Sequence, residues 1–501
     1  MTDTRDVAEP VTGFPPLSRL VAGHAERAPD RTALTFGGER WTYAQVGAAA
    51  DALAAVMAAD ALAGERVALL LPNSPETVLA YLACFAAGAI AAPLDARHAP
   101  PEIERALRRC RPSWLVVHAE RVDALGRVDP AVLDGVRILV AGADERHERL
   151  APLLLPRGAA PPAPPPPDAP AVLFFTSGSG GTPKGVLHDH TSARAMLTST
   201  SEALGDVGPD DVVQVAEPQV HVSGFIATLT ALGAGGTVAL LGGFDLDAYV
   251  AGLQANRPTL ICTHIDVLAQ VIRAPGARHE WFTSLRGTYT GGDTVPARLQ
   301  REFTALAGQP ICVGWGMTEA IWLTVVREPH LDREGCIGRP VGGAEVTTDP
   351  DTGELLVRGP MRMAGYWEDA ELTRATTVDG WLRTGDLGSR DEEGLWWFAG
   401  RSKDVIVRRT SKITPGEVEA AIDEHDDVFE SAVIAADDPE EGQVPVAFVV
   451  PRAGRSPTAE ELVAFLRPRI AAYKIPARFH FPETLPLTSS GKIAHHALHE
   501  P

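Results

Sequence analysis

Cysteine is scarce in this chain, and the few cysteines are scattered. Five occur among 501 residues, at Cys84, Cys110, Cys262, Cys312 and Cys336, and no two of them form a C-x-x-C pair. This pattern argues against a disulfide scaffold and against a zinc ribbon. Reduced, buried thiols are the expected alternative, so the sequence favours a cytoplasmic protein.

We expect no targeting peptide, and no long apolar run is uninterrupted. The N-terminal MTDTRDVAEP is acidic and has no apolar core, unlike a signal peptide. Glycines interrupt the uncharged runs Thr77–Leu94 and Phe225–Phe244, whereas a membrane span needs about 20 residues of one helix. Each run therefore predicts a buried helix, a glycine at its C-cap and a strand, and we expect no membrane partner.

Basic residues are fewer than acidic residues. Lys and Arg total 45 against 65 for Asp and Glu, which gives a formal charge of −20. Such a chain is not expected to bind nucleic acid or an anionic membrane. Hydrophobic residues (45%) and charged residues (22%) have the balance of a soluble globular protein. A local basic site for one small anion remains compatible with this total.

Apolar segments alternate with helical patterns through the first 400 residues. Strands are predicted at Glu65–Pro72, Ala89–Asp95, Trp114–Val117 and Arg137–Gly142, which is typical of parallel sheets covered by helices. The proline-rich stretch Pro156–Pro170 predicts an exposed connector.

After Gly400 the pattern becomes that of a smaller α+β unit. It has predicted strands at Val405–Val407, Glu430–Ile434 and Val444–Val450, and predicted helices from Pro415 and Thr458. We therefore expect an α/β protein with a large N-terminal domain of packed parallel and mixed sheets (1–400), a hinge (401–404) and a small mobile α+β C-terminal domain (405–501).

A glycine-rich loop follows the predicted strand Ala171–Phe175. Its sequence, TSGSGGTPKGV at 176–186, combines glycines, hydroxyls and Lys184, which together suit a phosphate group. A purely structural turn is the alternative. The loop is not a P-loop, because Pro183 and Gly185 stand where that motif needs glycine and a hydroxyl.

Further motifs follow in a fixed order. They are GGD at 291–293, GWGMTEA at 314–320, GELLVRGPMRMAGYW at 353–367, WLRTGDLG at 381–388, GRSKDVI at 400–406 and PLTSSGKI at 486–493. With the glycine-rich loop, they resemble the adenylate-forming superfamily of acyl-CoA synthetases, peptide-synthetase adenylation domains and luciferases. The resemblance implies attack of a carboxylate on the α-phosphate of ATP, with release of pyrophosphate and formation of an acyl-adenylate.

The resemblance also assigns residues. Those implied to bind ATP are Thr176, Ser177, Gly178, Ser179, Lys184, Gly291, Gly292, Asp293, Trp315, Gly316, Met317, Asp386 and Arg401. Trp315 would stack on adenine, with a core tryptophan as the alternative, and Asp386 would accept from ribose, with a tight turn as the alternative. Thr318 would bind phosphate, and Glu319 would ligate Mg²⁺.

Catalysis and the acyl pocket are implied in the same way. Lys492 would bridge the carboxylate and the α-phosphate, and Lys403 would be the hinge about which the C-terminal domain turns. His221 would stand beside the substrate carboxylate, although a lone histidine near apolar residues is more often a core residue. The implied pocket residues are His221, Val222, Gly224 and Phe225, and they favour a hydrophobic or aromatic acid.

The acceptor is the open question. Arg409 and Thr410 occupy a position where thiol-using relatives carry a glycine pair, and His495 replaces a frequent arginine. Threonine narrows a pantetheine channel and disfavours the dihedral angles that glycine allows. An amine acceptor, as in stand-alone amide bond synthetases, is therefore slightly favoured. CoA or the thiol of a carrier protein acting in trans is the alternative, and a non-catalytic nucleotide-binding protein is a distant one.

Overall fold

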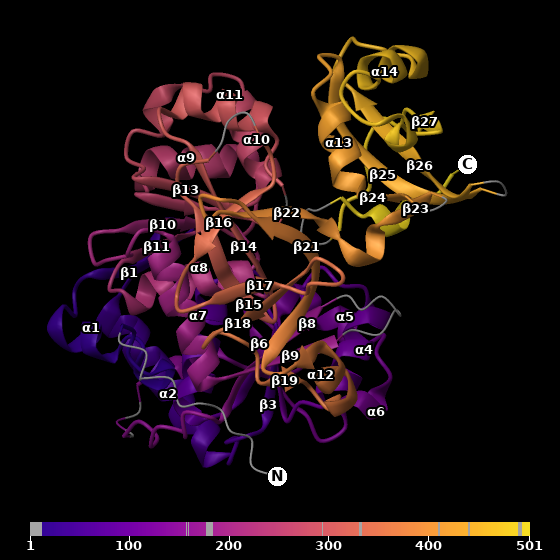
Figure 1. The fold of residues 1–501 in the computed structure, drawn as a ribbon. Coiled ribbons are helices and arrows are strands. Elements are labelled where there is room, and N and C mark those ends of the chain that lie inside the picture. The colour runs from indigo at the N-terminus through magenta and orange to yellow at the C-terminus, as the bar shows by residue number, and fades with distance from the viewer. Residues whose placement is uncertain are drawn as a thin grey trace.

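The computed structural model describes residues 13–156, 158, 160–176, 184–292, 294–329, 333–408, 411–438, 441–488 and 493–500. Three sheets organise these residues. Two large sheets pack together with helices around them, and a smaller sheet carries the C-terminal residues in a separate lobe (Figure 1). We call them the long sheet, the second sheet and the C-terminal sheet.

The long sheet combines a parallel centre with antiparallel strands on one side. Its strands, in spatial order, are β17 (Glu345–Thr348), β18 (Glu354–Arg358), β21 (Trp381–Arg390), β22 (Trp396–Arg401), β16 (Cys336–Pro340), β15 (Ala320–Val326), β14 (Ile311–Met317), β13 (Gly287–Gly291), β12 (Leu260–Cys262), β10 (Val212–Val215), β11 (Thr237–Leu240), β1 (Thr32–Phe36) and β2 (Glu39–Thr42). Strand β20 (Thr377–Val378) pairs with β21. The run from β14 to β1 is parallel throughout, and helical connections bury both of its faces.

The second sheet contains the early β-α-β units and the strand before the glycine-rich loop. Its order is β19 (Gly365–Tyr366), β9 (Lys184–Asp189), β8 (Pro170–Thr176), β4 (Ile90–Pro93), β3 (Arg66–Leu70), β5 (Trp114–His118), β6 (Arg137–Ala141) and β7 (Glu148–Arg149). Strands β8, β4, β3, β5 and β6 are parallel, as the sequence predicts.

The C-terminal sheet runs in the order β24 (Ser411–Ile413), β23 (Ile406–Arg408), β26 (Gly442–Pro451) and β25 (Val428–Asp438), with β27 (Arg478–His480) beside β26. A 3₁₀ turn at Ser402–Asp404 leads from β22 into it. Helices α13 (Pro415–Asp423) and α14 (Ala459–Leu466) accompany this sheet, and Thr458 with Glu461 forms a capping box at α14. The architecture confirms the expected α/β class with a smaller C-terminal unit.

The remaining helices belong to the two large sheets. They are α1 (Ala22–Arg27), α2 (Tyr43–Ala59), α3 (Pro75–Ala87), α4 (Pro100–Cys110), α5 (Val122–Leu125), α6 (Pro130–Leu133), α7 (His190–Ala203), α8 (Val222–Gly233), α9 (Leu246–Asn256), α10 (Ile265–Arg273), α11 (Ala297–Ala307) and α12 (Ala370–Thr376). In Figure 1, α9, α10 and α11 gather over one end of the long sheet.

The two uncharged runs form a buried helix followed by a strand, as predicted. Helix α3 ends at Gly88, whose φ of 70° is left-handed, and β4 follows. Helix α8 ends at Ala234 rather than at a glycine C-cap, and the next residue, Gly235, takes the left-handed φ of 84°. None of the helices in the described part of the chain combines the length and apolar character of a membrane span. All five cysteines are buried and free of disulfides.

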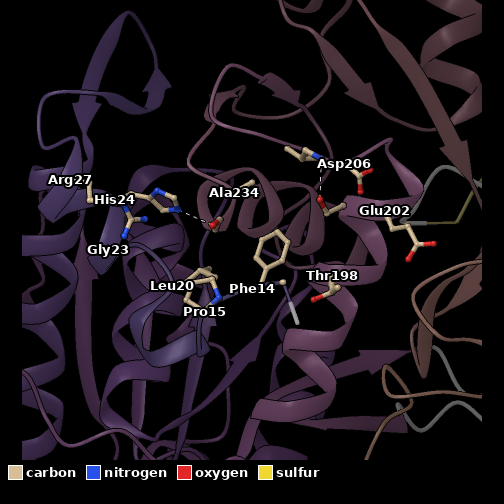
Figure 2. A pocket seen from close by; sticks show the side chains of 14 residues that line it. Phe14, Pro15, Leu20, Gly23, His24, Arg27, Thr198, Glu202, Asp206 and Ala234 are labelled. Atoms are coloured by element: carbon tan, nitrogen blue, oxygen red, sulfur yellow. Dashed lines mark hydrogen bonds between the residues drawn. The ribbon is translucent and has the colours of Figure 1, made fainter. Parts of the chain in front are cut away.

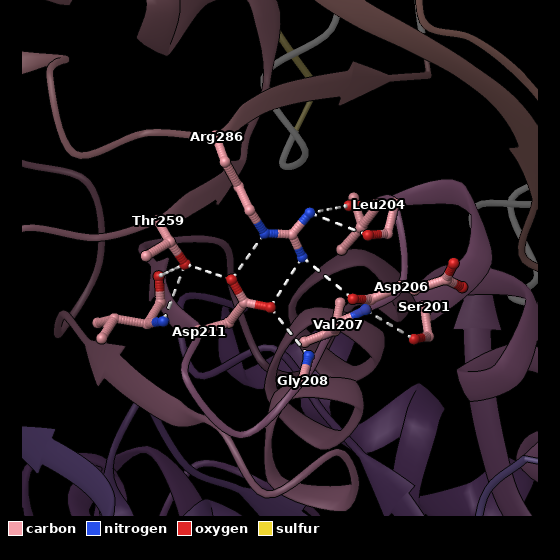
Figure 3. A network of polar contacts seen from close by, with 10 residues as sticks. Ser201, Leu204, Asp206, Val207, Gly208, Asp211, Thr259 and Arg286 are labelled. Atoms are coloured by element: carbon pink, nitrogen blue, oxygen red, sulfur yellow. Dashed lines mark hydrogen bonds and ion pairs between the residues drawn. The ribbon is translucent and has the colours of Figure 1, made fainter.

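A polar network holds the amino ends of the central parallel strands (Figure 3). The guanidinium of Arg286, just before β13, donates to both carboxylate oxygens of Asp211, at 2.7 and 2.8 Å. It also donates to the carbonyls of Leu204, Gly205 and Asp206, in the turn after α7. The hydroxyl of Thr259, just before β12, donates to Asp211 at 2.7 Å. The network fixes β10, β12 and β13 relative to one another, at the end opposite to the site described next.

Candidate active site

A cavity of about 440 Å³ lies at the carboxyl ends of parallel strands from both large sheets. Strands β4 and β8 of the second sheet reach it at Pro93 and Thr176, and β12 and β13 of the long sheet reach it at Cys262 and Gly291. Ligand sites of open α/β sheets lie at this edge. The predicted residues that line the cavity are Thr176, His221, Val222, Gly291, Gly292, Trp315, Gly316, Met317 and Thr318.

Some predicted residues fall outside the described chain. They are Ser177, Gly178, Ser179, Asp293 and Lys492, together with Arg409 and Thr410 of the acceptor argument. Lys403 lies in the 3₁₀ turn between β22 and β23. The roles assigned to these residues stay predictions.

Trp315, on β14, comes together with Asp386 and Arg401, which lie on the neighbouring strands β21 and β22. The indole Nε1 of Trp315 donates to Asp386 Oδ2 at 2.9 Å, and Arg401 Nε lies 3.5 Å from Asp386 Oδ1. Asp386 and Arg401 are register partners on β21 and β22. Trp315 is buried and still lines the cavity. The tryptophan and the carboxylate therefore form one polar and aromatic wall, beside the positive charge of Arg401.

Glu319 lies between β14 and β15 and is almost fully buried. The hydroxyl of Tyr366 donates to its Oε1 at 2.8 Å, and Lys184 Nζ lies 5.7 Å from the centre of the Tyr366 ring. Burial, with the adjacent carboxylate, holds the pKa of Tyr366 well above its ordinary value, so the phenol stays a hydrogen-bond donor. Lys184 is the register partner of Thr176 across the glycine-rich loop. The Glu319 carboxylate and the Lys184 ammonium therefore lie near each other, at the end of the glycine-rich loop.

Magnesium fits this corner through Glu319, because carboxylate oxygens are its preferred ligands and it keeps several water ligands of its own. Among the described residues, no group of three or more His, Cys, Asp or Glu side chains could hold a metal ion.

The side chain of His221 contacts two charged residues, Asp95 and Arg97, that follow strand β4 of the second sheet. Its Nε2 lies 3.5 Å from Asp95 Oδ2, and Arg97 forms a forked pair with the same carboxylate at 2.6 and 2.9 Å. Arg97 Nη2 is also 3.4 Å from His221 Nε2. Burial alone would raise the pKa of Asp95, but the hydrogen bonds from His221 and Arg97 hold it well below the ordinary range. An ionised Asp95 therefore orients the imidazole at the cavity wall.

Glu217 and His264 form a second pair of this kind on the long sheet. Glu217 follows β10 and His264 follows β12, which are neighbouring strands. His264 Nε2 lies 2.7 Å from Glu217 Oε2, and Glu217 Oε1 accepts from the Thr263 hydroxyl at 2.6 Å. Burial works to raise the pKa of Glu217, but the bonds from His264 and Thr263 lower it overall. The pair lines the same cavity as His221.

Two predicted pocket residues lie elsewhere. Phe225 is 1% exposed and packs edge-on against Phe174 and Tyr81, with ring centres 5.2 and 5.1 Å away. Helical geometry explains this, because Ile226 lies one turn after Val222 and shares its cavity face, whereas Phe225 points to the core. Gly224 is also away from the cavity wall, and a Cβ there would come within 2.3 Å of the Pro218 carbonyl oxygen.

Sequence reasoning missed Asp95, Arg97, Glu217 and His264. Asp95 ends a predicted strand, and Glu217 follows the apolar strand VVQV after one alanine. A charged residue at the carboxyl end of a buried parallel strand was the available signal. Their histidine partners come from distant segments, which no local pattern indicates.

A larger hollow, about 900 Å³, opens on another part of the surface (Figure 2). It is lined by Phe14, Leu20, His24, Glu202 and neighbouring residues, and His24 Nε2 bonds the Gly233 carbonyl at 2.9 Å. None of the residues that the sequence assigns to the site lines it. The cavity at the strand ends, and not this hollow, is therefore the candidate active site.

Comparison with known proteins agrees with this geometry. The model of the AMP-binding enzyme family matches residues 21–367, and that of the AMP-binding enzyme C-terminal domain matches residues 417–492. The chain belongs to the AMP-binding enzymes. This AMP-binding enzyme is an AMP-forming ligase, and the resemblance to the adenylate-forming superfamily is confirmed.

Individual relatives extend over nearly the whole AMP-binding enzyme. An indoleacetate–CoA ligase of Aromatoleum aromaticum is 34% identical over 492 residues, covering 95% of this chain and 96% of the relative. ATP-bound MatB from Rhodopseudomonas palustris superposes with a TM-score of 0.88 at 27% identity, covering 96% and 97% of the chains. The amide bond synthetase McbA from Marinactinospora thermotolerans gives a TM-score of 0.86 at 27% identity, covering 96% and 98%.

Proposed function

We propose that this enzyme adenylates an aromatic or hydrophobic carboxylic acid and passes the acyl group to an amine. The cavity carries the first part of the proposal. The cavity wall beside His221 is partly apolar, and some of the predicted nucleotide-binding residues, Thr176 and Trp315 among them, line the same space. The apolar residues of this wall are Val220, Val222, Ile226, Ile321 and Trp322. An apolar pocket with a few placed polar groups suits an acid whose body is hydrophobic. The relative named for indoleacetate acts on an aromatic acid of this kind.

Adenylation requires positive charge and fixed donors around the phosphates. Thr176 and Lys184 flank the glycine-rich loop and would bind phosphate oxygens. Mg²⁺ held at Glu319 would neutralise phosphate charge. Asp386 would accept hydrogen bonds from the ribose, in line with its place beside Trp315 and Arg401. These groups orient ATP, which is most of what nucleotidyl transfer needs.

The acid approaches the α-phosphate from the side opposite to the leaving pyrophosphate. A carboxylate oxygen attacks phosphorus, the bond to the β-phosphate bridge oxygen breaks, and pyrophosphate leaves. Lys492 would offset the charge that builds on the reacting oxygens, and His221, oriented by Asp95, would hold the second carboxylate oxygen. Two partners for the carboxylate leave it little rotational freedom.

The amine acceptor rests on Arg409 and Thr410. In the second step, the amine nitrogen attacks the acyl carbon, AMP leaves and the nitrogen loses a proton. This reaction needs no pantetheine arm, so a β-branched residue in place of glycine is harmless to it. McbA, an amide bond synthetase, shares the fold over 96% of this chain.

CoA is the second candidate acceptor, favoured by the name of the indoleacetate–CoA ligase at 34% identity. Mass spectrometry of products decides between the two. The enzyme is given an aromatic acid and ATP, with CoA, with simple primary amines, or with neither. We expect an amide and AMP with amines and little acyl-CoA.

Rapid acyl-CoA formation without amide would overturn the amine proposal and leave adenylation intact. A Thr410→Gly variant is the companion test. Increased acyl-CoA formation by this variant supports a narrowed channel, and unchanged product ratios contradict it.

A further inference from the structure

Tyr366 contacts two groups that the proposed reaction assigns to the phosphates of ATP. Its hydroxyl donates to Glu319 Oε1 at 2.8 Å, and the centre of its ring lies 5.7 Å from Lys184 Nζ. One side chain therefore meets the carboxylate proposed for Mg²⁺ through its hydroxyl and the ammonium proposed for phosphate oxygens through its ring. The motif at 353–367 contains this tyrosine, but the proposed reaction gives it no role.

The backbone of Tyr366 is fixed to the strand that begins at Lys184. Strand β19, which contains Tyr366, pairs antiparallel with β9, and Tyr366 is the register partner of Val186. The N–H of the next residue, Trp367, donates to the Gly185 carbonyl at 2.7 Å. This pairing sets the position of the tyrosine ring relative to the Lys184 ammonium.

The same segment also fixes the main chain of Glu319. The N–H of Met363 donates to the Glu319 carbonyl at 2.7 Å, and His188 Nε2 lies 2.8 Å from the Thr318 carbonyl oxygen. The turn between β14 and β15 is thus bonded at two successive carbonyls, and the Tyr366 hydroxyl bonds the side chain. Glu319 and Tyr366 are each 8% exposed, so water competes little for their hydrogen bond.

The hydroxyl of Tyr366 is suited to orient a metal ligand. Among the described residues, it belongs to the one side chain that bonds the Glu319 carboxylate, and it takes Oε1. Carboxylates that bind metal ions are themselves hydrogen-bonded by an outer group, and loss of that group costs about 10- to 100-fold in metal affinity or activity. A phenol donor is uncharged, so it orients the carboxylate without adding a positive charge that repels a metal ion.

The ring of Tyr366 acts on Lys184 in a different way. An ammonium over an aromatic face is attracted by the ring without a hydrogen bond, so its N–H donors stay available for phosphate oxygens. Although both contact Tyr366, the described residues Lys184 and Glu319 form no ion pair with each other. The ammonium and the carboxylate are therefore placed side by side without neutralising one another.

We propose that Tyr366 is a positioning residue of the phosphate site: its hydroxyl orients the Glu319 carboxylate for Mg²⁺, and its ring places the Lys184 ammonium. The inference rests on the proposed function, because the metal ion and the phosphates belong to the ATP bound for adenylation. It predicts separate losses when the hydroxyl and the ring are removed.

The test measures nucleotide binding without turnover. Calorimetry with the full-length enzyme gives the Kd of α,β-methylene-ATP in saturating Mg²⁺ and in EDTA, and the ratio of the two Kd values measures the contribution of the metal. We expect Mg²⁺ to strengthen binding in the wild type. Tyr366→Phe should reduce this gain about tenfold and leave the Kd in EDTA unchanged. Tyr366→Leu should also weaken binding in EDTA, because Lys184 loses the ring.

A double-variant cycle separates positioning from a general structural role. Glu319→Gln should reduce the gain from Mg²⁺, and Tyr366→Phe added to it should have little further effect, because the hydroxyl acts through the carboxylate. Tyr43→Phe is the matched control. Its buried hydroxyl donates to the carbonyls of Leu232 and Gly236, at 2.9 and 2.7 Å, so its loss should lower stability without changing the gain.

An unchanged gain in Tyr366→Phe, or additive losses in the double variant, would overturn the role of the hydroxyl while leaving the proposed adenylation intact. Undiminished binding by Tyr366→Leu in EDTA would overturn the role of the ring. Wild-type binding that is insensitive to Mg²⁺, in an enzyme that catalyses ATP–pyrophosphate exchange, would overturn the inference as a whole. The expected binding pattern without exchange for any acid would contradict the proposed function and leave this inference standing.

Discussion

Replacing Arg286 by alanine should destabilise the protein and leave the chemistry of the folded enzyme unchanged. The guanidinium makes hydrogen bonds to Asp211 and to three backbone carbonyls, as Figure 3 shows. Asp211 has a side chain only 10% exposed, and Arg286 is 38% exposed. Removing one partner of a fully buried pair costs about 3–5 kcal/mol. Solvent screening of the half-exposed arginine reduces this to about 2–3 kcal/mol.

The assay is thermal or urea unfolding followed by tryptophan fluorescence. A loss of this size lowers the midpoint temperature by about 2–4 °C in a domain this large. Arg108→Ala is the matched control, because Arg108 also pairs with two carboxylates, Glu104 and Asp129, but is 50% exposed. The control should lose much less stability, because solvent screens both of its ion pairs. Equal losses in the two variants would refute the argument that burial makes the Arg286 network strong.

Three further predictions concern the site and its support. Asp95→Asn should reduce kcat/KM for adenylation about tenfold, since His221 loses the ionised partner that orients it; an unchanged kcat/KM would show that Asp95 does not orient the imidazole. Trp315→Phe should raise the KM for ATP several-fold by releasing Asp386 from its indole donor, and an unaltered KM would contradict the shared wall. Burial lowers the pKa of His188 from 6.5 to about 4, so the unfolded chain binds more protons than the folded one and stability should fall as pH drops from 6.5 towards 4. Unfolding midpoints measured across this pH range should decline less in His188→Gln than in the wild type. An equal decline in both proteins would assign the pH dependence to other groups.

Regular features could be predicted from the sequence because they depend on neighbouring residues. The alternation of apolar segments gave the parallel strands, Gly88 marked the end of α3, and Thr458 with Glu461 marked the start of α14. Motif order indicated Trp315 and Thr318, and both line the cavity. The predictions of strands and helix ends used residues within a few positions of one another, where propensity and periodicity apply, whereas the site residues came from the resemblance to a family.

The rest depends on contacts between distant segments. Asp95 meets His221 only because β4 of the second sheet ends next to the start of α8, and Glu217 meets His264 because β10 and β12 pair in register. Phe225 was expected in the pocket because it adjoins a motif residue, but the turn of α8 points it into the core. Side-chain direction on a helix follows from where the helix packs, which the motif does not record.

The central claim is that this enzyme activates a carboxylic acid as its adenylate with the help of Lys492. Acid-dependent ATP–pyrophosphate exchange, measured with a panel of aromatic acids for the wild type and for Lys492→Ala, tests it most directly. We expect exchange with at least one acid and a loss of about 100-fold or more in the variant. No exchange with any acid, or undiminished exchange in Lys492→Ala, would contradict it.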